Sequence, residues 1–121
     1  MKRFLPLALM ALSIPAYAAT TTVPGTMILV PLDIAIVTTG GVAVTAIAAG
    51  NRVAGGWIMN PASATINLCI NEMGTAVGTT SAGNVTCIVP GQTYTVTPGI
   101  GPVSVISSDS AHPFSGMGYK Q

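Results

Sequence analysis

The feature that most constrains the fold is the regular interruption of short β-forming runs by Gly, Pro or Asn. After residue 18 these runs are rich in Val, Ile and Thr, whereas Leu, Glu, Lys and Arg, the usual builders of exposed helices, are scarce. Apolar and charged residues do not alternate at helical spacing there. We therefore predict nine strands, at residues 26–32, 34–38, 42–48, 56–59, 65–71, 84–89, 93–97, 103–108 and 114–119.

Strand spacing and turn chemistry predict how these strands are arranged. In residues 65–71, Ile66, Leu68 and Ile70 share one face, as in a half-buried strand, and Pro90-Gly91 fits the centre of a type II turn. Seven to nine short strands at this spacing are typical of a sandwich or barrel. We predict an all-β fold: a single antiparallel β-sandwich, jelly-roll or immunoglobulin-like.

The first eighteen residues have the organisation of a signal peptide. Lys2 and Arg3 are followed by an apolar run of about eleven residues, then by Pro15 and an Ala-x-Ala site that ends at Ala18. The run is shorter than the roughly 20 apolar residues that span a bilayer. We predict a signal helix in residues 1–18, one β-sandwich domain in residues 19–121, and export to the periplasm, cell surface or exterior. The alternative is a short buried N-terminal helix.

The charge that remains after residue 18 excludes one class of partner. The basic side chains are Arg52 and Lys120, and the acidic ones are Asp33, Glu72 and Asp109, which gives a formal net charge of −1. Nucleic-acid binding relies on several Lys and Arg contacts to phosphate, so we expect no nucleic-acid partner. A nearly neutral surface favours self-association. The apolar run 27–37 contains a proline and an acid and is too short to span a membrane.

Cys69 and Cys87 flank a glycine-rich run at residues 73–83. An even number of cysteines in a small exported domain is typical of a disulfide. In the chain-entropy model, a disulfide that closes a loop of this length stabilises the fold by about 3 kcal/mol. Alternation puts Cys69 on the polar face of its strand but Cys87 on the face of Val85 and Val89. Either the disulfide lies on an outer face beside exposed valines, which a neighbouring subunit could cover, or a bulge shifts one register.

The residue types of a hydrolytic triad occur together only at residues 109–113, in Asp109-Ser110-Ala111-His112-Pro113. Triad members converge from separate segments, so a turn in which Asp109 or Ser110 caps backbone amides is the favoured interpretation. The three acids show no shared cleft, no metal-ligand spacing occurs, and no phosphate-binding glycine motif follows a strand. We predict no catalytic residue, no cofactor, no metal site and no enzymatic activity. Residues 84–86 match a glycosylation sequon.

Arg52, Trp57 and Tyr94 are the candidate interface residues. Arginine beside an aromatic anchor is common in binding hot spots, which supports an interface at Arg52 and Trp57. The alternative is a core tryptophan between sheets, with Arg52 extended along a strand start. Trp57 and Tyr94 would also serve as stacking platforms for a glycan.

Several segments carry a resemblance to a known class of protein. They are Asn51-Arg52-Val53-Ala54-Gly55-Gly56-Trp57-Ile58-Met59-Asn60-Pro61, the predicted strand at residues 65–71, Gly74-Thr75-Ala76, Val89-Pro90-Gly91-Gln92-Thr93-Tyr94 and Gly101-Pro102-Val103-Ser104-Val105-Ile106-Ser107. Over residues 50–110 the chain resembles small β-sandwich proteins of tailed-phage and prophage structural modules. The resemblance implies a virion decoration or tail-accessory role and carries no catalytic residue. The chain differs from that type in its signal peptide and cysteine pair.

The leading functional hypothesis is a non-catalytic structural or interaction protein, a virion accessory or surface-assembly subunit that contacts copies of itself or other proteins. One alternative is an exported ligand- or carbohydrate-binding module. Another is a fimbria-like subunit, with which Gly116, Gly118 and Tyr119 near the end of the chain agree.

Overall fold

The computed structural model describes residues 26–76, 78, 79, 81 and 83–121, so the predicted signal peptide lies outside the described residues. All regular structure in the described chain is β-strand, and every strand pair is antiparallel. The strands are β1 (Ile28–Pro31), β2 (Ile36–Val37), β3 (Val44–Ile47), β4 (Gly55–Met59), β5 (Leu68–Asn71), β6 (Val85–Ile88), β7 (Thr93–Val96), β8 (Val103–Ile106), β9 (His112–Pro113) and β10 (Ser115–Lys120).

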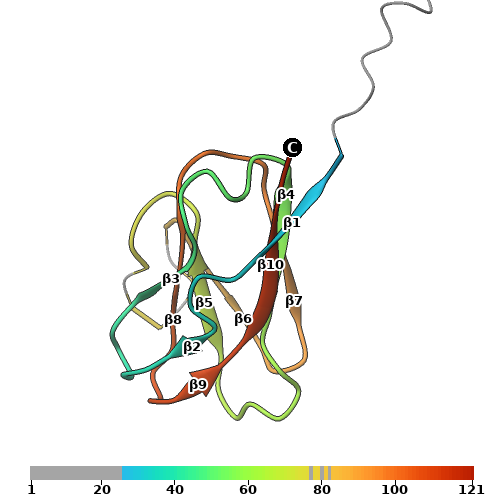
Figure 1. Cartoon of the computed structure of the whole chain (residues 1–121). Coiled ribbons are helices and arrows are strands. Elements are labelled where there is room, and N and C mark those ends of the chain that lie inside the picture. Colours follow the sequence, from blue (N-terminus) through green and yellow to red (C-terminus); the bar gives the residue numbers. More distant parts are fainter. Residues whose placement is uncertain (1–25, 77, 80, 82) are drawn as a thin grey trace, which may run out of the picture.

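Two four-stranded sheets form the sandwich. The first has the order β1-β10-β4-β7 and the second β3-β8-β5-β6, while β2 and β9 pair at one end. Figure 1 shows the sheets side by side, with β10 and β4 on one side and β3, β5 and β8 on the other. The predicted all-β sandwich is confirmed. The described residues contain no helix long and apolar enough to cross a membrane.

The connections share one feature with the immunoglobulin fold. The chain passes from one sheet to the other between β4 and β5 and again between β7 and β8, so β4 lies beside β7 and β5 beside β8. Strands B, C, E and F of the immunoglobulin fold are related in the same way. Here the final strand, β10, takes the place beside β4 that the first strand A has there.

The core lies between the facing sides of the two sheets. Alternation turns Ile58 and Val96 inward from the first sheet, and Leu68, Ile70 and Val105 inward from the second. All five are at most 1 % exposed. The same cluster includes Val37, Ala46, Ile47, Ile88, Val103 and Phe114.

Each of the nine predicted strands is present, although most are shorter than predicted. The tenth, β9, was missed because His112-Pro113 looks like a chain break in the sequence. Proline is tolerated at a sheet edge, and the ladder continues where the Phe114 amide donates to the Ala35 carbonyl at 3.0 Å.

Two glycines allow β10 to pack closely against its neighbours. A Cβ atom at Gly118 would overlap the carbonyl oxygen of Asn51, and one at Gly116 would overlap that of Trp57. Their presence near the end of the chain thus has a packing explanation within this sandwich.

Candidate functional site

Arg52 lies in the loop between β3 and β4 and is 7 % exposed. Its guanidinium donates to the carbonyl oxygens of Gly101 at 2.7 Å, Thr97 at 2.9 Å and Glu72 at 2.9 Å. It also forms an ion pair with the Glu72 carboxylate at 3.5 Å. One side chain therefore ties together three loops at the same end of the sandwich.

The Glu72 carboxylate completes this cluster from the other side. It accepts hydrogen bonds from the Tyr94 hydroxyl at 3.0 Å and from the Thr97 amide and hydroxyl at 2.6 and 2.9 Å. Burial raises the pKa of Tyr94 to about 12, and the hydrogen bond to Glu72 adds to the increase. No local sequence pattern indicates this role of Glu72, because its partners Arg52, Tyr94 and Thr97 are distant in sequence.

The three candidate interface residues do not form one surface. Arg52 is buried and each of its three side-chain nitrogens donates to a backbone carbonyl, and Tyr94 points inward and packs against the core. Trp57 points the other way. Because it alternates with the buried Ile58, its side chain lies half-buried on the outer face of the first sheet. Arg52 and Tyr94 are thus engaged in contacts within the fold, and their role in an interface stays a prediction. Trp57 and Tyr94 lie on opposite faces of the first sheet, so one glycan could not stack on both.

His112 is 1 % exposed and is held by two acceptors. Its Nδ1 lies 2.7 Å from Oδ1 of Asp109, and its Nε2 lies 2.8 Å from Oδ1 of Asn60. The Asn60 amide nitrogen donates to the carbonyls of Ile66 and Ile88, so its oxygen faces the imidazole.

The order of this network differs from that of a catalytic triad, in which histidine lies between serine and carboxylate. Here Asp109 lies between His112 and Ser107, whose hydroxyl donates to it at 2.9 Å. Burial alone would raise the pKa of Asp109, but hydrogen bonds from Ser107 and His112 and the histidine charge lower it. Ser110 accepts from the Gly40 amide at 3.0 Å, so its hydroxyl bonds to a distant loop rather than to the turn at residues 109–113.

The disulfide between Cys69 and Cys87 is confirmed, and it lies on the outer face of the second sheet. The two residues are direct partners in the β5–β6 ladder, which has no bulge. The prediction of two exposed valines was half right: Val89 is exposed, whereas Val85 is buried in a small cluster with Ala76.

The chain's own loop covers this face. Asn71 accepts from the Met73 amide and donates to the Thr75 carbonyl, which turns the chain back over the sheet. The Ala76 amide then donates to the Ser104 hydroxyl of β8 at 3.0 Å. Cys69 is buried beneath this loop, whereas Cys87 stays partly exposed.

A shallow depression of about 300 Å³ is lined by Ile66, Asn67, Thr79 and Ser108. None of these side chains titrates near neutral pH. Among the described residues, no three His, Cys, Asp or Glu side chains lie together as metal ligands would.

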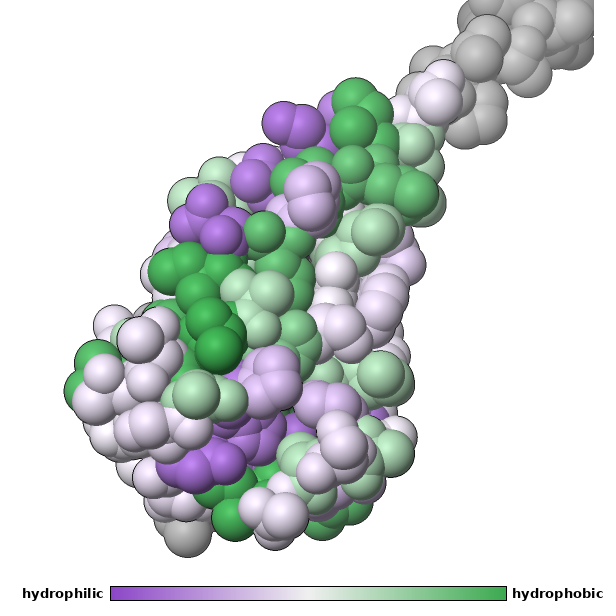
Figure 2. Space-filling view, turned by 60° about the horizontal axis from the view of Figure 1, so that its bottom comes forward, coloured by the Kyte–Doolittle hydropathy of each residue, from purple (hydrophilic) through white to green (hydrophobic). Residues whose placement is uncertain are grey.

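The most distinctive surface is the stretch from Met27 to Ile36. Five of the ten exposed large apolar side chains in the described residues lie here: Met27, Ile28, Leu29, Ile34 and Ile36. We call the first three, with β1, the apolar edge, since β1 is the outermost strand of its sheet. Figure 1 shows β1 at the margin beside β10, and Figure 2 shows apolar side chains gathered next to the start of the described chain.

The apolar edge continues into the outer face of the first sheet. The register aligns Pro31, Met117, Trp57 and Thr95 in one row across four strands. Rows on either side contain Leu29 with Tyr119, and Ser115 with Met59 and Thr93. This face carries no charged residue.

Searches with this chain against protein-family models, curated proteins and solved structures found no match. The resemblance to phage structural proteins stays a prediction. The candidate site is therefore defined by the surface of the molecule itself: the apolar edge and the uncharged face that adjoins it.

Proposed function

We propose that this chain is an exported, non-catalytic structural protein that assembles with copies of itself, or with a larger particle such as a virion or a cell surface. The observation that supports this most is the apolar edge, where Met27, Ile28 and Leu29 are 52, 48 and 59 % exposed on an outermost strand. Proteins normally protect such strands with charges, bulges or covering loops. Strand β1 has Pro31 at its end but no charged side chain, and exposed apolar surface of this kind is typical of an interaction site.

The placement of charge agrees with this proposal. Arg52, Glu72 and His112 are engaged in contacts within the fold, so apolar side chains, threonines and strand edges remain for contacts with partners. The Cys69–Cys87 disulfide is in keeping with an oxidising compartment and hence with export.

The first experiment expresses the full chain with export and determines the intact mass and the oligomeric state. We expect cleavage after Ala18 and a multimer, or a stable complex with a particle, by size-exclusion chromatography with light scattering. A monomer at all concentrations that binds neither virions nor envelope fractions contradicts the proposal. Mass spectrometry of purified virions and of periplasm then distinguishes a viral from a cellular assembly.

A second candidate function is glycan binding, and Trp57 is the observation that favours it. Its ring lies half-buried on an uncharged sheet face between Met117 and Thr95, where a sugar ring can stack. Binding on a glycan array that is lost in Trp57→Ala supports this candidate. If the variant still binds the glycan, or if the protein binds no glycan on the array, glycan binding at Trp57 is contradicted.

A further inference from the structure

We propose that β1 pairs with β1 of a second copy of this chain, antiparallel across a two-fold axis near Leu29. The two first sheets would join into one continuous sheet of eight strands. This inference rests on the proposed function and deepens it, because it names both the surface and the partner.

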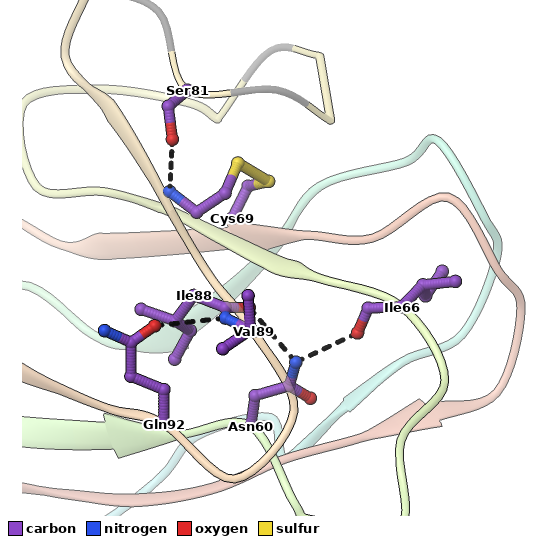
Figure 3. The surroundings of a disulfide bond; sticks show 8 residues. Asn60, Ile66, Cys69, Ser81, Ile88, Val89 and Gln92 are labelled. Carbon is purple, nitrogen blue, oxygen red and sulfur yellow. Dashed lines mark hydrogen bonds between the residues drawn. A yellow bond between two sulfur atoms is a disulfide. The ribbon is translucent and has the colours of Figure 1, made fainter.

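Two of the four sheet edges are blocked by the chain itself. At β6, the Cys87 amide donates to the Ser81 hydroxyl, and just beyond the strand the Val89 amide donates to the Gln92 side chain (Figure 3). At β3, the ladder is broken by an irregularity between Thr45 and Ile47, and the Ala46 carbonyl accepts from the Asp33 amide. Such features prevent strand addition.

The remaining two edges differ in side chains. β7 exposes Thr93 and Thr95, and just beyond it the Thr97 amide donates to Glu72. Within the described residues, no side-chain hydrogen bond reaches β1, and Ile28 and Leu29 of the strand, like Met27 before it, are apolar and about half exposed. β1 is therefore the edge that the fold leaves open to another strand.

The chemistry of this edge fits a second copy better than a different partner. A strand edge is satisfied by another strand, and an antiparallel partner with the same sequence places apolar side chains opposite apolar side chains on both faces. The segment 27–31 carries no charge that would select an oppositely charged partner or repel its own copy. Because the contact is isologous, it closes at two copies.

The contact is short, since Pro31 has no amide hydrogen and ends the useful edge. An interface of this size belongs at the low end of specific interfaces. We expect a dissociation constant on the order of micromolar.

The first test compares Leu29→Lys with Val89→Lys in the exported, disulfide-bonded chain by analytical ultracentrifugation. Leu29 and Val89 are 59 and 53 % exposed, so the same charge is introduced at matched sites. Leu29→Lys removes two buried leucines per dimer, and we expect a dissociation constant raised by about 100-fold or more. Val89→Lys should leave it within about 3-fold of the original.

The second test replaces Leu29 with cysteine. Direct antiparallel partners have Cα atoms roughly 4.5–5.5 Å apart, within the range of a disulfide. Leu29→Cys should therefore form a covalent dimer upon mild oxidation, and Val89→Cys should not.

The outcomes separate this inference from the proposed function. Multimers that persist in Leu29→Lys and do not cross-link through Leu29→Cys leave the assembly function in place but overturn β1 pairing. A dimer that dissociates only after unfolding indicates an exchanged β1 strand and also overturns it. A monomer without any partner contradicts both proposals.

Discussion

In one region of this molecule charged side chains are buried, and in another apolar side chains are exposed, the reverse of the usual arrangement. At the loop end, Arg52 and the carboxylate of Glu72 are largely withdrawn from water and bonded to each other and to backbone. At the apolar edge, Ile28 and Leu29 are about half exposed. The comparison indicates that Arg52 and Glu72 serve the fold, while the proposed surface for partners is apolar. Changes in the first region should therefore alter stability, and changes in the second should alter assembly.

The largest effect is expected from Arg52→Ala. The substitution removes three hydrogen bonds to loop carbonyls and leaves the Glu72 carboxylate without its cation. Breaking a buried pair on one side costs about 3–5 kcal/mol. Urea unfolding should show this loss, with Lys120→Ala as a control that changes stability by less than about 0.5 kcal/mol. If Arg52→Ala lowers the free energy of unfolding by less than about 1 kcal/mol, water replaces the hydrogen bonds of Arg52 and the prediction is contradicted.

The paired substitution of Cys69 and Cys87 by alanine is expected to cost about 3 kcal/mol, because the loop that the disulfide closes becomes unrestrained in the unfolded chain. Thermal unfolding of the oxidised protein, the reduced protein and the double variant measures it. The reduced protein and the variant should agree closely. Unchanged stability in both would show that the covering loop alone holds this face.

A smaller effect is expected from the pH dependence of Tyr94. An unfolded tyrosine titrates near pH 10, and in the fold burial raises the pKa to about 12. The stabilisation by Tyr94 is thus complete below pH 10 and is lost as the pH rises from 10 through 12. Because Tyr94 is partly solvated, we expect less than about 1 kcal/mol. The free energy of unfolding, measured at pH 8, 10 and 11, should decline with pH, and the decline should be smaller in Tyr94→Phe. An equal decline in both proteins would show that Tyr94 is not its cause.

The smallest effect on stability is expected at the apolar edge. Leu29→Ser changes a side chain outside the core, so the free energy of unfolding of the monomer should change by about 0.5 kcal/mol or less. Dilute-sample unfolding measures this change, while sedimentation at high concentration measures dimerisation. A large stability loss in the monomer would mean that the apolar edge belongs to the fold rather than to a partner.

The sequence predicted the strands well because their signals are local. Alternation in residues 65–71 and the breaks at Gly, Pro and Asn required no knowledge of distant contacts. The disulfide was also predictable from two cysteines in a small exported chain. Only β9 was missed, since a two-residue ladder that contains proline has no local pattern.

The sites were less predictable because they depend on residues far apart in the chain. Arg52 resembled a surface hot spot until its partners at positions 72, 97 and 101 were brought around it. The exposure of Leu29 was equally hidden, since an apolar run has the same sequence signature in a core strand and an unprotected edge strand.

The disulfide has a consequence for proteolysis. Cys69 and Cys87 lie in adjacent strands on either side of the loop that covers the second sheet. A protease that cuts the chain between Glu72 and Asn84 would divide it into two fragments that remain covalently joined through the sulfurs. Such a nicked protein should migrate as one species without reductant and as two with it, while most of the sandwich stays folded.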